Sequence, residues 1–304
     1  MAGAFWHAML MAELAVAAAI AWPVNALIGG SFWALLALWL GAFVLLQPLL
    51  VLLAFTLSRA AARGAPGPLR ARTVLVESIA LLTAAFVMST HRPGRMPHRG
   101  TPLSDAHTAR TRRPPVLLVH GILCNGAIWG PLRRRLAAEG FDRVGVMDLE
   151  PLFADIEAHA VTVEQRLRAM QADSGGAPVV IVAHSMGGLV ARAALRLIGP
   201  GVIGRIVTLG TPHHGTAIAC RVPLVPTRQM CPNSLWLRQL NDEQEGALGV
   251  PVTTLYSRED TLVAPARSAE LAGARVVPVD GLGHLGLAVS PRVLERVLEE
   301  LRRD

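Results

Sequence analysis

Ser185 lies where a strand-forming run of residues gives way to a helix-forming one. Residues 178–184 (PVVIVAH) are mostly apolar and β-branched, as in a buried strand, and residues 186–195 are typical of an alanine-rich amphipathic helix. A sharp turn between them needs small residues two positions before and after the serine, and these are Ala183 and Gly187. Such a serine either caps the helix or acts as a nucleophile. A nucleophilic serine needs a base, an acid that orients the base, and donors for an oxyanion.

His284 is the predicted base and Asp260 the predicted acid. Asp260 follows residues 251–257 (PVTTLYS) and His284 follows residues 274–280 (ARVVPVD), so each stands in a loop after a predicted strand, in the chain order serine, acid, histidine. Glycines at positions 281, 283 and 286 predict an exposed loop around His284. The other acids that fit the role less well are Glu259, Asp280 and Asp148. The other histidines weighed for the base are His120, His184, His213 and His214, and the last two come too early in this order.

Two backbone N–H groups are predicted to form an oxyanion hole. One belongs to Met186, the residue after the nucleophile, and the other to the loop that follows residues 115–120 (PVLLVH). In that loop Gly121 permits a close backbone approach, Ile122 is the favoured donor, and Leu123 is the alternative. His120 is expected to brace this loop without taking part in the chemistry.

Short apolar runs alternate with helical patterns from residue 115 onward, and these elements must position the three side chains. The predicted strands are residues 115–120, 143–148, 178–184, 204–210, 251–257 and 274–280; the predicted helices include 128–139, 156–172 and 291–302. Such alternation predicts an α/β fold with a mostly parallel sheet covered on both faces. Residues 211–249 interrupt the alternation and predict a lid-like insertion whose apolar residues are Leu235, Trp236, Leu237 and Leu240.

Residues 115–304 resemble the α/β-hydrolase lipases and esterases of bacteria. The matching stretches, in order, are PVLLVHG, AHSMGG, TLGTPHHGT, DTLVAP and GHLGL. The AHSMGG form, with alanine in place of the first glycine, itself resembles one group of small bacterial lipases. The resemblance implies an α/β-hydrolase fold, Ser185, Asp260 and His284 as catalytic triad, and Ile122 and Met186 as oxyanion donors.

Two long apolar runs, residues 8–28 and 32–57, predict transmembrane helices, and the first lacks the basic segment of a cleaved signal peptide. The run 74–88 is shorter and carries Glu77, which makes it a marginal third span. We therefore expect a membrane anchor over residues 1–90 with two or three transmembrane helices, a basic Pro/Arg-rich tether over 91–114, and a catalytic domain over 115–304.

The net charge of +7 resides entirely in the anchor and tether, since residues 1–113 hold ten arginines and three acids. This distribution favours contact with membrane lipids and gives no basic face for a nucleic acid. Arginines on both sides of the run 74–88 conflict under the positive-inside rule if three spans exist. Cys220 and Cys231 are either disulfide-bonded, which requires an oxidising compartment, or free buried thiols. The catalytic domain is placed outside the cytoplasm, at a bacterial inner membrane.

The sequence thus predicts a membrane-anchored serine ester hydrolase that acts on a lipid or other lipophilic acyl ester through an acyl-enzyme on Ser185. The alternatives are an acyltransferase with the same triad and a catalytically silent membrane scaffold or transport component. No cofactor and no metal are expected, because the adjacent His213 and His214 lack further ligands at suitable spacing, and Cys124 is read as an apolar filler. Nothing in the sequence indicates the oligomeric state.

Overall fold

Six parallel strands form the sheet at the centre of the molecule. The structure, a computed structural model, describes residues 1–62, 69–91, 113–244 and 248–303. The strands are β1 (Val116–Val119), β2 (Val144–Met147), β3 (Val179–His184), β4 (Ile203–Leu209), β5 (Val252–Tyr256) and β6 (Arg275–Pro278). Their order in the sheet is β2-β1-β3-β4-β5-β6, and each neighbouring pair is parallel. The six predicted strands are confirmed, with ends that differ by one or two residues.

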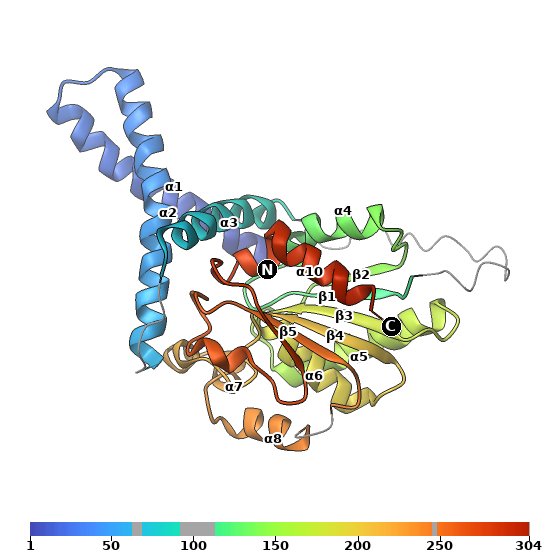
Figure 1. The fold of residues 1–304 in the computed structure, drawn as a ribbon. Coiled ribbons are helices and arrows are strands. Elements are labelled where there is room, and N and C mark those ends of the chain that lie inside the picture. Colours follow the sequence, from blue (N-terminus) through green and yellow to red (C-terminus); the bar gives the residue numbers. More distant parts are fainter. Residues whose placement is uncertain (63–68, 92–112, 245–247, 304) are drawn as a thin grey trace.

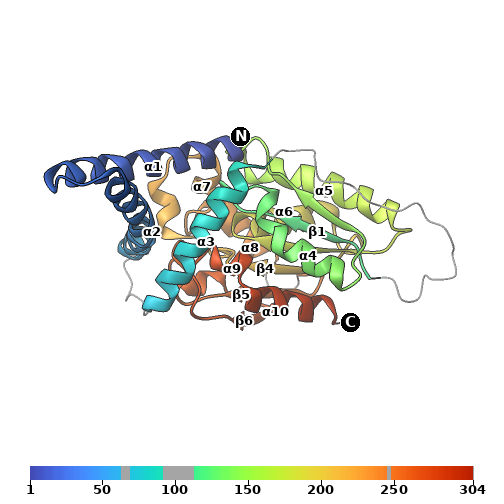
Figure 2. The same cartoon turned by 90° about the horizontal axis from the view of Figure 1, so that it is seen from above.

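Helices cover both faces of the sheet because the side chains of β1 and β3 alternate between two apolar clusters (Figures 1 and 2). On one face, Leu117 and Ile181 pack with α5 (Ile156–Asp173), α6 (Met186–Ile198) and α8 (Leu235–Glu243). On the other face, Leu118 and Val182 pack with α4 (Gly130–Ala138), α9 (Gly286–Val289) and α10 (Pro291–Leu301). This second layer also contains α3 (Ala71–Ser89).

Three helices, α1 (Ala2–Leu27), α2 (Phe32–Ala62) and α3, are long and apolar enough to cross a membrane. Helices α1 and α2 form a hairpin whose turn points away from the sheet (Figure 1). Gln47 donates to Glu13 at 2.9 Å inside this hairpin, so the buried carboxylate has a polar partner on the neighbouring helix. Helix α3 instead crosses the hairpin and lies along the body (Figures 1 and 2).

The insertion at residues 211–249 holds three short elements: the 3₁₀ helix η3 (Ala217–Arg221), α7 (Val225–Gln229) and α8. Leu237 and Leu240 are buried in the core, while Leu235 is 78% exposed. The apolar residues expected on a lid therefore divide between packing and surface. Residues 245–247 of this insertion, and residues 92–112 of the predicted tether, lie outside the described part of the chain.

Candidate active site

Ser185 stands at a strained turn between β3 and α6. Its backbone has φ 56° and ψ −130°, a region that a residue with a side chain seldom adopts. The sequence makes room for this turn with glycines: a β-carbon on Gly187 would lie 2.5 Å from the carbonyl oxygen of His120, and one on Gly121 would lie 2.6 Å from Cβ of Ser185. Local sterics therefore fix the serine at the carboxyl edge of the sheet, against the loop after β1.

The structure brings Ser185, His284 and Asp260 together in a line of hydrogen bonds. Nε2 of His284 lies 2.9 Å from Oγ of Ser185, and Nδ1 lies 3.0 and 2.9 Å from the two carboxylate oxygens of Asp260. All three residues are buried, at 8%, 4% and 1% exposure for the serine, histidine and aspartate. A neutral imidazole with its proton on Nδ1 would donate to Asp260 and accept from the serine hydroxyl.

The charges of this pair stabilise each other. Burial lowers the pKa of His284, but the charge and hydrogen bond of the adjacent Asp260 carboxylate, together with the charge of Glu77, outweigh burial and raise this pKa above its ordinary value. Burial raises the pKa of Asp260, but His284 and the N–H groups of Val263 and Leu262 outweigh it, so the net pKa of the carboxyl is lowered. A carboxylate held ionised beside an imidazole favours the imidazolium that forms when a proton leaves the serine.

The predicted oxyanion donors come from two segments beside Ser185. Met186 is the first residue of α6, where backbone N–H groups lack partners inside the helix. Ile122 follows Gly121, which touches the serine turn. His120 holds this loop: its Nδ1 lies 2.8 Å from the Gly121 carbonyl oxygen, and its Nε2 accepts from N–H of Leu149 at 3.1 Å. The oxyanion role of both amides remains a prediction.

Comparisons with known proteins agree with this architecture. Residues 154–267 match the family described as PGAP1-like alpha/beta domain. The mature form of a Bacillus licheniformis lipase is 18% identical, with a TM-score of 0.57 over 65% of this chain and 96% of that chain. Lipase B of Aspergillus fumigatus is 15% identical, with a TM-score of 0.57 over 83% of this chain and 86% of that chain. The chain has the α/β-hydrolase fold.

The acids that compete with Asp260 have other partners in this fold. Glu259 accepts hydrogen bonds from the start of α3, at Arg70 and Thr73. Asp280 accepts from the backbone N–H of Arg258 at 3.2 Å. Asp148 accepts from N–H of Gly126 at 2.7 Å and contacts His91 at 2.9 Å. Of these four acids, Asp260 is the one hydrogen-bonded to the His284 ring in the described residues.

Two further residues pack around His284; sequence reasoning considered one of them, His184, only as a candidate base and did not consider the other, Gly210. The His184 ring lies 4.7 Å from the His284 ring between centroids, and its Nε2 lies 3.0 Å from the His284 carbonyl oxygen. Burial and the nearby charge of His284 lower the pKa of His184 to about 3, which keeps it neutral. Gly210 has φ 56°, and a β-carbon there would lie 3.1 Å from a carboxylate oxygen of Asp260. The sequence signal that could have identified both residues is their position at the carboxyl end of a predicted strand, β3 for His184 and β4 for Gly210.

The loop around His284 is buried rather than exposed, which corrects the sequence prediction. His284 is 4% exposed, and Gly286 is likewise buried. The glycines serve close packing: a β-carbon on Gly286 would lie 3.1 Å from a carboxylate oxygen of Glu77, and one on Gly283 would collide with the same side chain. Glu77 belongs to α3, far from this loop in sequence.

His213 and the three cysteines, which the sequence also singled out, are held within the fold. His213 is buried with Nε2 3.1 Å from Oγ1 of Thr208, and burial followed by the charge of Arg192 lowers its pKa. Within the described residues no group of three or more His, Cys, Asp or Glu side chains is arranged to hold a metal ion. Burial raises the pKa of Cys124 to about 12, so this thiol stays protonated. Cys220 and Cys231, whose state the sequence left open, form a disulfide bond.

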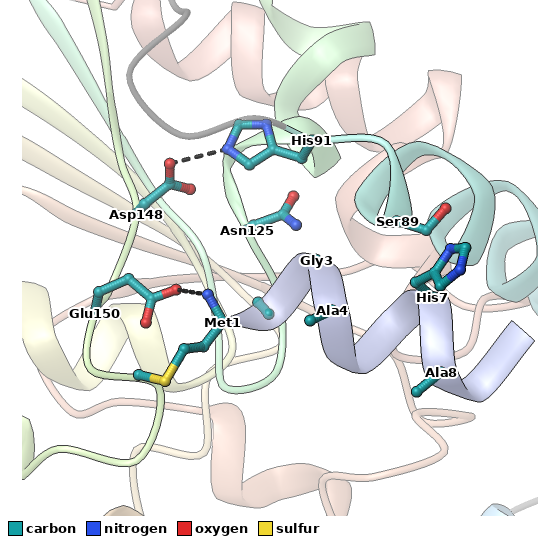
Figure 3. Close-up of a pocket in the computed structure, with 11 residues that line it drawn as sticks. Met1, Gly3, Ala4, His7, Ala8, Ser89, His91, Asn125, Asp148 and Glu150 are labelled. Atoms are coloured by element: carbon teal, nitrogen blue, oxygen red, sulfur yellow. Dashed lines mark hydrogen bonds and ion pairs between the residues drawn. The ribbon is translucent and has the colours of Figure 1, made fainter.

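A cavity of about 410 Å³ lies where the start of α1 meets the loops after β1 and β2 (Figure 3). Two polar contacts flank it: the N-terminal amino group pairs with Glu150 at 2.8 Å, and Nε2 of His91 lies 2.9 Å from a carboxylate oxygen of Asp148 (Figure 3). Its lining residues include neither Ser185 nor His284. The cavity therefore belongs to the junction between α1 and the hydrolase fold, apart from the serine.

Proposed function

We propose that this protein is a membrane-anchored serine hydrolase of lipophilic carboxylic esters. The observation that carries the proposal is the 2.9 Å contact between Nε2 of His284 and Oγ of Ser185, with Asp260 bonded to the opposite ring nitrogen. A serine that only capped α6 would accept from a backbone N–H of that helix, and Ser185 makes no such side-chain bond.

The mechanism follows from these contacts. Oγ of Ser185 attacks the ester carbonyl carbon while Nε2 of His284 takes the hydroxyl proton, and Asp260 stabilises the imidazolium. The oxyanion receives hydrogen bonds from the N–H groups of Met186 and Ile122. The tetrahedral intermediate expels the alcohol, which takes the proton from His284, and leaves an acyl-enzyme. Water then attacks the acyl carbon while His284 takes its proton. The second tetrahedral intermediate breaks its bond to Oγ of Ser185, releases the carboxylic acid, and Oγ receives the proton back from His284.

The position of the apolar hairpin supports a lipophilic substrate. The start of α1 bonds to the loop after β1, where Trp6 donates to the Leu123 carbonyl oxygen at 2.5 Å. The end of α2 bonds to the loop after β5, where Ser58 donates to the Thr261 carbonyl oxygen at 2.8 Å. These loops lie at the carboxyl edge of the sheet, as Ser185 does, so the membrane and the serine share one side of the molecule. The similar structures described as lipases agree with an ester of this class.

We place the hydrolase fold outside the cytoplasm. The disulfide between Cys220 and Cys231 supports an oxidising compartment. The arginines near the hairpin argue for the opposite side under the positive-inside rule. Two of them have roles in packing, however: Arg59 donates to a backbone carbonyl of the loop after β5 at 2.8 Å, and Arg70 pairs with Glu259 at 3.2 Å.

The test is hydrolysis of p-nitrophenyl esters of short and long acyl chains by the full chain in detergent micelles. We expect activity that Ser185→Ala lowers by about 10⁴-fold or more, because the residual rate comes from binding and the oxyanion donors alone. The matched control is Ser174→Ala, at the end of α5 on the opposite edge of the sheet, which should retain full activity. Equal rates in wild type and Ser185→Ala, or none in either protein at any chain length, would refute the proposal.

A further inference from the structure

Glu77 is a buried carboxylate, 3% exposed, with no part in the chemistry proposed above. It projects from α3 into the loop that carries His284. One carboxylate oxygen accepts from the backbone N–H of Leu285 at 2.7 Å, and the other accepts from N–H of Gly286 at 2.8 Å. Both amides come directly after the histidine, so Glu77 holds the backbone that orients the ring.

Thr261 extends this contact to the loop of the acid. Its hydroxyl donates to Glu77 at 3.3 Å and accepts from the backbone N–H of His284 at 3.3 Å. Thr261 is the neighbour of Asp260 in the chain. A single carboxylate on α3 therefore connects to the loop of the base and, through one hydroxyl, to the loop of the acid.

Helix α3 is fixed to the hydrolase fold at both ends. At its start, Glu259 accepts from the backbone N–H of Arg70 at 3.1 Å and from Thr73, and also binds the backbone N–H of Gly281 at 3.0 Å. At its end, Met88 is fully buried in the apolar cluster on one face of the sheet, and its carbonyl oxygen accepts from Asn125 at 2.9 Å. Its opposite face exposes Leu75, Ile79 and Phe86.

We propose that Glu77 is a positioning residue for His284, and that α3 is a helix of the hydrolase fold and does not span the membrane. The first part rests on the proposed function of Ser185. The second follows because Glu77 keeps its partners on the catalytic loops when α3 lies against the sheet, whereas a transmembrane α3 would leave this carboxylate within lipid. The exposed apolar side chains of α3 then face the membrane surface from outside the bilayer core.

The test compares Glu77→Gln and Glu77→Ala with Ile79→Ala, a control on the exposed face of the same helix. Hydrogen–deuterium exchange of the full chain in detergent micelles reads the backbone directly, without relying on activity. We expect the segment 280–290 to exchange about tenfold faster or more in Glu77→Ala, because two amides lose their acceptor. Glu77→Gln keeps the side-chain volume and one acceptor, so it should show a smaller local increase.

Kinetics with a p-nitrophenyl ester supply the second readout. We expect both Glu77 variants to lower kcat by about 10- to 100-fold with KM within about twofold, because the histidine is displaced while the binding surface remains. Ile79→Ala should match the wild type in both measurements.

Unchanged exchange in segment 280–290 would overturn the positioning role whether or not the protein hydrolyses esters. Faster exchange throughout the chain in both Glu77 variants would also overturn it, since Glu77 would then support the fold as a whole. Locally faster exchange in a wild-type protein without esterase activity would leave the contact intact and reject the function of Ser185 instead. The experiments can therefore reject either proposal without rejecting the other.

Discussion

Asp260→Asn is expected to abolish the proposed ester hydrolysis through the orientation of one amide. Oδ1 of Asp260 accepts the backbone N–H groups of Leu262 and Val263, each at 2.8 Å. An asparagine must keep its carbonyl oxygen at this position, so its NH₂ group replaces Oδ2 and points at Nδ1 of His284. The imidazole then accepts at Nδ1 and carries its proton on Nε2, where it has no lone pair for the proton of Ser185.

The magnitude follows from the cost of restoring the productive tautomer. Turning the amide over would place its NH₂ group against the two backbone N–H groups and leave both without an acceptor. A buried donor without a partner costs about 1 to 3 kcal/mol, so the pair costs about 2 to 6 kcal/mol. This corresponds to a loss of about 30-fold to 3 × 10⁴-fold in kcat. Asp260→Ala leaves Nδ1 free to keep its proton and is expected to be no less active than Asp260→Asn.

The assay is steady-state hydrolysis of a p-nitrophenyl ester at saturating substrate, with melting temperatures to show that each variant is folded. The matched control is Asp280→Asn, which changes the other nearby aspartate and is expected to retain activity within about threefold, since Asp280 contacts Arg258 on the surface. Activity of Asp260→Asn within tenfold of the wild type would refute the reasoning. Inactivation by Asp280→Asn would show that Asp260 is not the acid of the triad.

Three further predictions concern pH, the serine turn and the membrane. Only the neutral imidazole of His284 accepts the serine proton, and its pKa is raised, so kcat/KM should fall with decreasing pH around a midpoint above the ordinary histidine pKa of about 6.5. Asp260→Ala should move this midpoint to lower pH. An unchanged midpoint in the variant would contradict the pairing of His284 with Asp260. Gly187→Ala should lower the free energy of unfolding by about 1 to 3 kcal/mol and also reduce kcat, because its β-carbon would lie 2.5 Å from a carbonyl oxygen at the end of β1. Gly175→Ala, which has open space around it but a strained φ of 72°, should lower stability in the same denaturant assay and leave kcat unchanged. A reporter inserted at Gly30 and a second reporter fused to the C-terminus should indicate opposite sides of the membrane. The same side for both reporters would reject an α1–α2 hairpin whose two ends both bind the hydrolase fold.

The sheet and the serine turn were predictable because their signals are local. Residues 178–184 carry the apolar, β-branched pattern of a strand buried on both faces, and Ala183 and Gly187 meet the steric demand of the turn within five residues. Asp260 and His284 were predictable from chain order, since loops after parallel strands gather at one edge of the sheet. The α/β-hydrolase fold is the result that the comparisons confirm, and the roles of the three side chains await the assays above.

The contacts of α3 were not predictable from its own pattern. Residues 74–88 read as a marginal membrane span, because local composition does not distinguish a helix buried against protein from one buried in lipid. The glycines at 283 and 286 were read as marks of an exposed loop, although the structure uses them to admit Glu77. The exposed-loop reading was wrong because Glu77 and its partner Gly286 are 209 positions apart in the chain, so no local pattern links them.

The N-terminal helices contact all three predicted catalytic loops, so they do more than anchor the hydrolase fold. A tether would hold the hydrolase fold near lipid without affecting the geometry of its site. Here Trp6 of α1 bonds to the predicted oxyanion loop, Ser58 of α2 bonds to the loop of Asp260, and Glu77 of α3 bonds to the loop of His284. Displacement of these helices, by detergent or by truncation, would therefore release the loops that carry the predicted catalytic residues. We expect a chain that begins at residue 113 to lose activity on soluble esters as well as on lipids, an outcome that a simple anchor would not produce.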